Sequence, residues 1–148
     1  MKIRKRIQED LKTSMKAKDG NRVSVLRLVL AAVKNREIEL KSELDDDQIL
    51  AEIMSAAKRR KESIEAFKEG GREDLVLKEG KELAILEEYL PEQLSSEELK
   101  GLIQEAIEST GASSPRDMGK VMKVIMPEVQ GKADGKVVNL IVKELLSS

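Results

Sequence analysis

The 148-residue chain contains no cysteine, no histidine and no tryptophan, and it has one tyrosine and one phenylalanine. Without cysteine or histidine it forms no disulfide, and it lacks thiolate nucleophiles, imidazole general bases and the ordinary ligands of structural zinc. With so few rings, it is also poorly equipped to bind nucleic acid by stacking bases on aromatic side chains. The chain therefore lacks the residue types on which most known active sites depend, and we expect no catalytic residue, no metal and no cofactor.

Long apolar runs are absent as well. No stretch of about 18 apolar residues is present that would cross a membrane. The first ten residues, MKIRKRIQED, carry charges throughout and lack the apolar core of a signal peptide. We therefore expect a cytosolic (cytoplasmic) protein that does not bind a membrane.

Charged residues make up 37% of the chain and nearly cancel, leaving a net charge of −1. Their distribution is uneven, which matters more for binding partners than the total does. Residues 1–41 have 12 Lys and Arg against 5 Asp and Glu, whereas residues 42–99 have 8 against 17. Residues 100–148 have 7 against 6. The chain thus begins with a basic arm, continues through an acidic middle and ends mildly basic.

Apolar residues recur every three or four positions along most of the chain, a spacing that predicts amphipathic helices, and no alternating pattern predicts a strand. The fold class is therefore expected to be all-α. We place a boundary at Pro91, because the residue before a proline is pushed out of the helical conformation. This boundary gives an N-terminal four-helix unit, residues 1–91, and a C-terminal three-helix unit, residues 92–148. The helices are expected over residues 3–18, 23–40, 45–68, 73–89 and 95–111, with two more between residues 116 and 146.

The segment 23–40 is apolar over more than half of its helical circumference, which leaves only a polar strip around Arg27. A helix of this kind is expected in the middle of a bundle. Arg36 lies among its apolar positions, so its side chain should extend to solvent or find a carboxylate. Further on, the cationic run of residues 58–61 circles a helix and does not form one patch. We interpret it as solvated surface, with Arg60 reaching toward the core.

The segment from Arg116 to Leu146, which we name the basic hairpin, carries the best candidate for a functional surface. Its apolar residues predict two helices joined by a loop. At 100° per residue, its cations lie on the faces opposite the apolar ones. Lysine-rich helices are common on soluble proteins, so an ordinary solvated surface also fits this pattern. The candidate RNA-binding residues are Arg116, Lys120, Lys123, Lys132, Lys136, Asn139 and Lys143.

Several residues of the basic hairpin have expected structural roles. Pro127 should end the first helix, and Asp134 should cap the second. Gly131 and Gly135 should permit the turn between them. Gly119 lies inside the first helix, where glycine costs about 1 kcal/mol relative to alanine. It allows either closer helix packing or close approach to an RNA backbone, and we favour packing.

Three stretches of the sequence resemble a known family. They are LRLVLAAVKNREIEL, YLPEQLSSEEL and DMGKVMKVIMPEVQGKADGKVVNLIVKELL. Together they resemble the YqeY-like proteins, in the family that joins YqeY to the tail of GatB. The most specific pieces are GKVM at residues 119–122 and GKADG at residues 131–135. The resemblance covers nearly the whole chain.

The resemblance implies a C-terminal module of the GatB/YqeY type. GatB is a subunit of the glutamine-dependent amidotransferase that converts mischarged Glu-tRNA(Gln) or Asp-tRNA(Asn), and its helical tail docks on tRNA. The family is thereby linked to carbon–nitrogen ligases that use glutamine as amido donor. The implied partners are tRNA, an amidotransferase subunit or an aminoacyl-tRNA synthetase. A helical protein–protein adaptor that binds no RNA is the open alternative.

We predict that the purified chain has no glutaminase or amidotransferase activity. The family's amidotransferases phosphorylate the aminoacyl carboxylate in the GatB body and release ammonia in a separate amidase subunit, and neither part has a counterpart here. The sequence also has no glycine-rich phosphate loop after a strand and no activated nucleophile. The measurement is ammonia release from glutamine. Release that is proportional to protein and survives repurification would contradict the prediction.

Overall fold

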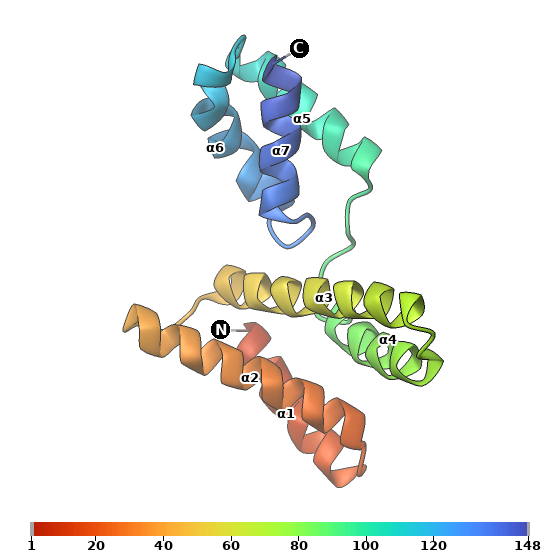
Figure 1. The fold of residues 1–148 in the computed structure, drawn as a ribbon. Helices are drawn as coiled ribbons and strands as arrows, with labels where there is room; N and C mark the ends of the chain where they lie inside the picture. The colour runs from red at the N-terminus through yellow and green to blue at the C-terminus, as the bar shows by residue number, and fades with distance from the viewer. Residues whose placement is uncertain (1, 148) are drawn as a thin grey trace. The chain divides into compact units, whose positions relative to one another are not determined.

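The computed structural model describes residues 2–147, which form helices joined by loops and contain no strand. The expected all-α fold class is confirmed. Contacts divide the chain into two compact units, Met1–Pro91 and Glu92–Ser148, and each is described by itself. The first unit contains α1 (Lys2–Lys16), α2 (Gly20–Leu40), α3 (Asp46–Glu69) and α4 (Glu73–Glu87), and the second contains α5 (Ser96–Thr110), the 3-10 helix η1 (Pro115–Asp117), α6 (Met118–Val129) and α7 (Gly135–Ser147) (Figure 1).

Reciprocal side-chain caps fix where two of the helices begin. The side chains of Asp45 and Ser95 accept hydrogen bonds from the backbone N–H groups of Gln48 and Glu98, at 2.8 and 3.1 Å. The side chains of Gln48 and Glu98 in turn accept from the N–H groups of the two cap residues. These bonds satisfy amide groups that a helix start otherwise leaves free. At the other end of α5, Gly111 takes a φ of 69°, a conformation that costs glycine little.

The N-terminal unit encloses an aliphatic core to which one ring, that of Tyr89, contributes. Helix α2 supplies four of its buried residues, and α3 supplies three. Burying a side chain of this kind contributes roughly 1.5–3 kcal/mol, so the helices are held mainly by these contacts. The buried residues of the core are Ile7, Val25, Leu26, Val29, Val33, Leu44, Ile49, Ile53, Ala57, Ile85, Leu86 and Tyr89.

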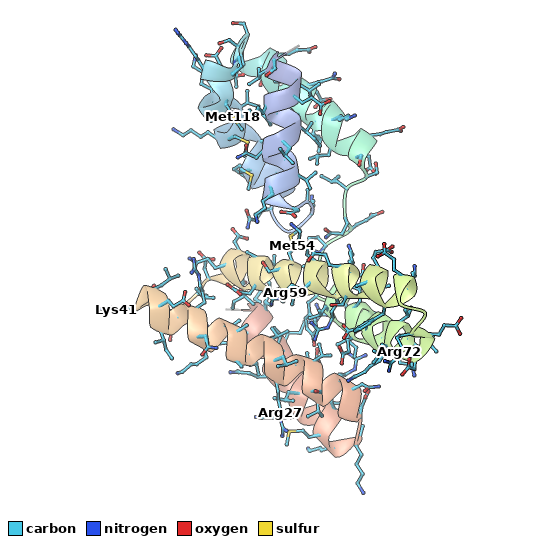
Figure 2. The ribbon with its side chains drawn as sticks, in the orientation of Figure 1. Arg27, Lys41, Met54, Arg59, Arg72 and Met118 are labelled. Atoms are coloured by element: carbon cyan, nitrogen blue, oxygen red, sulfur yellow. The ribbon has the colours of Figure 1, made fainter. Side chains whose placement is uncertain are left out.

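Helix α2 is less enclosed than its composition indicates, which corrects the expectation of a helix in the middle of the bundle. Its buried residues lie along one face, whereas Leu28 and Ile38 are 58% and 64% exposed. Arg27, labelled in Figure 2, is exposed beside Leu28. Helices α1, α3 and α4 all contact α2, but together they cover only the face that carries the valines. The apolar arc of the sequence is therefore wider than the surface available to bury it.

Glu37 of α2 holds two neighbouring segments of the N-terminal unit. Its carboxylate binds the guanidinium group of Arg4 on α1, and it accepts a hydrogen bond of 2.9 Å from the backbone N–H of Leu44. Leu44 lies in the loop before α3 and is 1% exposed. The Leu44 amide, followed by the Arg4 guanidinium, holds the pKa of the Glu37 carboxyl below its usual range. Glu37 thus ties α1 and the start of α3 to α2.

Two further arginines pair with carboxylates, an outcome that the sequence predicted as one possibility for Arg36 but not for Arg60. Arg60 of α3 lies 3.3 Å from a carboxylate oxygen of Glu82 on α4, and the two side chains are only 15% and 12% exposed. Its buried Nε makes no aligned hydrogen bond among the described residues, so the contact is an ionic one. Arg36 is about half exposed and binds Glu39 at 2.9 Å. Arg60 therefore lies in a largely buried ion pair between α3 and α4, whereas Arg36 pairs at the surface.

The C-terminal unit has a second core, made by α5, α6 and α7 and free of aromatic rings. The segment before α5 is fastened to the α6–α7 loop, because the N–H of Leu94 donates to the carbonyl of Lys132 at 2.9 Å. The three helices therefore fold around one centre (Figure 1). Its buried residues are Leu99, Ile103, Ala106, Val121, Ile125, Val129, Val138, Ile141, Val142 and Leu146.

Helix α6 continues through Pro127 to Val129, which corrects the expectation that Pro127 ends it. A proline inside a helix removes one N–H donor and crowds the carbonyl four residues earlier. Here the loss falls in the last turn, where only a short piece of helix follows. Val129 is fully buried, and its burial offsets the cost of one missing hydrogen bond.

We predict that Val29→Asp unfolds the N-terminal unit. Val29 is 6% exposed and lies in the aliphatic core. An aspartate there would bury a carboxylate without a partner, which costs on the order of several kcal/mol. Thermal unfolding followed by circular dichroism measures the effect. The matched control is Lys34→Asp at an exposed position of α2, and equal melting curves for the two variants would refute the core assignment.

We also predict that Glu37→Gln weakens the N-terminal unit at neutral pH and flattens its acid sensitivity. A carboxyl whose folded-state pKa is depressed stabilises the fold above its ordinary pKa of about 4.5. That stability is lost as the pH falls through the depressed folded-state value. The measurement is denaturant unfolding over a pH series, with Glu62→Gln on the exposed surface of α3 as control. A Glu37→Gln chain with the parent's stability at pH 7 would contradict the role of Glu37.

Candidate nucleic-acid interface

The seven candidate residues of the basic hairpin are all exposed. Arg116 lies in η1, Lys120 and Lys123 lie in α6, and Lys132 lies in the loop that follows. The remaining three residues belong to α7. Met118, labelled in Figure 2, marks the start of α6, from which long side chains project outward. The seven residues in chain order are Arg116, Lys120, Lys123, Lys132, Lys136, Asn139 and Lys143.

The outward direction of these side chains follows from the positions of the buried ones. Helix α6 buries Val121, Ile125 and Val129, which are spaced four residues apart and so share one face. Its lysines lie on the remaining arc. Helix α7 buries Val138, Ile141, Val142 and Leu146, which leaves its two lysines and Asn139 facing solvent in the same way.

Most of the candidate cations form no ion pair within the described part of the chain. Lys120 lies 3.8 Å from a carboxylate oxygen of Asp117, one turn earlier in the chain, and its side chain is 67% exposed. The pKa of Asp117 is lowered chiefly by a hydrogen bond from the backbone N–H of Ser113, with a smaller contribution from Lys120. Among the described residues, the other five cations form no ion pair. Their charges are therefore available to a ligand.

The loop between α6 and α7 is built by a glycine and an aspartate. Gly131 has a φ of 76°, which favours glycine. The side chain of Asp134 accepts a hydrogen bond of 3.0 Å from the N–H of Lys136, and its carbonyl accepts one from Val138. These bonds satisfy free amides at the start of α7. Gly135 has no positive φ and is the first residue of α7, so it does not serve the turn in the expected way.

Gly119 has open space where its side chain would be. A Cβ atom built there would meet no atom within 4 Å, and the residue is exposed. Its φ lies outside the positive region. The expectation that Gly119 permits closer helix packing therefore has no support from its surroundings. Neither packing nor backbone conformation within the C-terminal unit requires glycine at this position.

Exposed aliphatic side chains accompany the cations of the basic hairpin. Val124 on α6 is 39% exposed, and Val137 and Leu140 on α7 are 42% and 66% exposed. Sequence analysis did not single out these residues. Leu140 was nevertheless detectable, since at 100° per residue it lies closer to Lys136 and Lys143 than to the buried valines of α7. The outer faces are thus basic but not wholly polar.

The N-terminal unit contains an open, charged pocket of about 560 Å³ that sequence analysis did not predict. Two oxygen–nitrogen contacts, 2.5 and 3.2 Å long, join Arg22 to Glu88. Tyr89 donates its hydroxyl proton to Asp10, and burial raises the pKa of that phenol. Arg6 stacks 4.5 Å above the same ring. Both arginines of the pocket already pair with carboxylates, so these side chains connect helices and are less suited to binding a charged ligand. The residues that line the pocket are Arg6, Asp10, Thr13, Ser14, Arg22 and Glu88.

Residues 2–147 give no sign of a metal site or of a membrane-spanning helix. No group of three or more acidic side chains in this range is arranged to hold a metal ion. None of its helices combines the length and apolarity that crossing a membrane requires.

Comparison with known protein families matches residues 4–146 to the YqeY-like proteins. The chain belongs to the YqeY-like family. This membership confirms the family resemblance carried by the sequence, and it covers both structural units.

Three curated relatives of this YqeY-like chain are each named altered inheritance of mitochondria protein 41, mitochondrial. The Kluyveromyces lactis protein is 35% identical over 134 residues, which cover 88% of this chain and 68% of the relative. A Saccharomyces cerevisiae protein is 34% identical over 131 residues, covering 88% and 69%. The Eremothecium gossypii protein is 38% identical over 85 residues, covering 57% and 46%. The chain thus spans about two thirds of the first two relatives and less than half of the third.

The names of these relatives contradict the expectation of a cytosolic protein. Both yeast relatives that align over most of the chain are named as mitochondrial proteins. The expectation depended on the charged first ten residues and on the lack of long apolar runs, and neither feature distinguishes the cytosol from the interior of an organelle.

Proposed function

We propose that this YqeY-like chain is an accessory protein that binds tRNA through the basic hairpin and has no active site of its own. The observation that carries the proposal is the set of exposed cations in η1, α6, α7 and their loop, five of which form no ion pair among the described residues. Support also comes from the resemblance of this segment to the tRNA-docking tail of GatB. The YqeY-like chain would then assist a glutamine-dependent amidotransferase as a partner and would not itself catalyse the reaction.

Binding would depend on phosphates and RNA shape. The basic hairpin contains no aromatic ring, so it has no platform on which bases could stack. Ammonium groups contact phosphate oxygens without reading sequence, and structured RNA is often recognised in this way. Asn139, exposed among the lysines of α7, supplies an amide that hydrogen-bonds sugar or phosphate. We therefore expect similar affinity for several tRNAs.

The spacing of the cations fits a strand of RNA backbone lying along a helix. Lys136 and Lys143 are seven residues apart on α7, which is about 10 Å along the helix axis. Lys120 and Lys123 of α6 are three residues apart and thus neighbours on its surface. Because α6 and α7 pack around one core, their outer faces point in different directions. A ligand that contacts both faces must pass over the loop, where Lys132 lies.

The alternative function, a protein–protein adaptor, is favoured by a different observation. Val137 and Leu140 place apolar surface on α7 between and beside its lysines. Interfaces between proteins bury such residues at their centres. An amidotransferase subunit or an aminoacyl-tRNA synthetase would be the partner in that case. Leu140→Ser should then weaken partner binding, whereas it should hardly change affinity for RNA.

We predict that binding to tRNA weakens steeply with salt and depends on the basic hairpin. Each phosphate contact releases counterions, so the logarithm of affinity should fall linearly with the logarithm of salt concentration. Replacing Lys120, Lys123, Lys132 and Lys136 together by alanine should weaken binding. It should also flatten the slope by a little under one unit per lost contact, roughly as for nucleic-acid duplexes. Fluorescence anisotropy over a salt series measures both effects.

A charge-matched variant controls for the loss of net positive charge. It replaces four exposed cations of α3 and α4 by alanine, namely Lys58, Arg59, Lys61 and Lys78. Both variants should stay folded, since exposed substitutions change stability by only about 0.5 kcal/mol each. If the hairpin variant binds tRNA as tightly as the parent at every salt concentration, tRNA binding by this surface is refuted and the adaptor function replaces it.

A further inference from the structure

We propose that Gly119 is a contact point at which the sugar–phosphate backbone of bound RNA lies directly against helix α6. This inference rests on the proposed function and refines it, because it names the place where the ligand comes closest to the protein. The class of ligand is an RNA strand whose phosphates are held by neighbouring lysines.

The first observation is that the C-terminal unit gives no reason for glycine at this position. A Cβ atom at Gly119 would meet nothing within 4 Å among the described residues, so no neighbour excludes a side chain. Its backbone has no positive φ. Gly119 is the second residue of α6, which follows η1 directly, and glycine is the least favourable helical residue apart from proline. Packing and conformation within the chain therefore do not explain why a glycine, and not a larger residue, lies at this position.

The second observation concerns the residues that neighbour Gly119 on the surface of α6. Residues four apart on a helix are neighbours on one face, so Lys123 lies beside Gly119, one turn along α6. Lys120 follows it directly in the chain. Both lysines are exposed. Gly119 thus forms a shallow place next to two cations, at which a ligand's backbone can approach the helix without meeting a side chain.

The chemistry of the contact follows from these positions. A ribose resting on the Cα of Gly119 would bring the adjoining phosphates within reach of the ammonium groups of Lys120 and Lys123. A methyl group at position 119 would hold the strand away from the helix and lengthen both charge contacts. The loss would be steric, because alanine removes no charge.

Gly101 provides a matched control within the same unit. It is also an exposed helical glycine, in α5, and a Cβ atom there would likewise meet nothing within 4 Å. Its neighbours four residues away are Glu97 and Glu105, which repel phosphates. Alanine at either glycine should favour the helix, more so at Gly101 in the interior of α5 than at Gly119 in the first turn of α6. Only the change at Gly119 lies where RNA is proposed to bind.

The experiment compares the parent chain, Gly119→Ala, Gly119→Gln and Gly101→Ala by thermal unfolding and by binding to a tRNA transcript. Both alanine variants should melt a few degrees higher than the parent, roughly 2–8 °C, because alanine is the better helix former. Gly119→Ala should bind tRNA roughly threefold to tenfold more weakly, and Gly119→Gln more weakly still. The salt dependence should keep the parent's slope, since no cation is lost. Gly101→Ala should bind as the parent does.

A gain in stability together with a loss of affinity at Gly119 supports the contact, since unfolding cannot produce that combination. If the parent binds tRNA in a way that requires the hairpin lysines, yet Gly119→Ala binds equally well, the contact is overturned and the proposed function stands. An equal loss of affinity in Gly101→Ala overturns it too, because the effect is then not local. A parent chain without affinity for tRNA overturns both.

Discussion

Both units are held together by the burial of aliphatic helix faces, and this constraint decides which side chains face outward. Isolated helices as short as those of the C-terminal unit, which have 12 to 15 residues, are marginally stable in water. With one phenylalanine and one tyrosine in the chain, isoleucine, leucine and valine provide nearly all of the buried surface. Each helix of the C-terminal unit must therefore turn its aliphatic face inward. The cations between those residues are exposed as a direct result of how the core packs.

Arginine and lysine occupy different places in this fold. Arg4, Arg22 and Arg60 pair with carboxylates of other segments in the N-terminal unit. The guanidinium group suits such positions because its several N–H donors lie in a fixed plane. Lysines of the basic hairpin other than Lys120 form no ion pair among the described residues. Since the fold makes no use of these charges, they can be assigned to ligand binding without a conflict between stability and function.

Sequence periodicity was sufficient for the all-α fold class and for the direction of the side chains in the basic hairpin. Caps such as Ser95 with Glu98 were also predictable, because they depend on residues close together in the chain. The periodicity of apolar residues gave wrong predictions where contacts between residues distant in the sequence determine burial or the end of a helix. It cannot show how many neighbours surround α2, so the exposure of Leu28 was missed. Nor did it show that burial of Val129 lets α6 continue past a proline.

Other features had no signal in a single sequence. Glu37 is one of many glutamates, and its role depends on Arg4 and Leu44 being brought to it by folding. The open surroundings of Gly119 became visible only once the neighbouring helices were in place. The cellular compartment of the relatives could likewise not be predicted from the amino-acid composition, because helices pack in the same way in mitochondrial and in cytosolic proteins.

If the outer faces of η1, α6 and α7 hold RNA, amide resonances of those residues should respond to it first. The most direct measurement is a titration of the isotope-labelled chain with a tRNA transcript, followed by nuclear magnetic resonance. We expect the largest shift changes at outward-facing residues around Gly119, Lys123, Lys132 and Lys136, with α3 and α4 almost unchanged. Largest changes in α3 or α4, or no change at any residue at a saturating tRNA concentration, would contradict RNA binding by the basic hairpin.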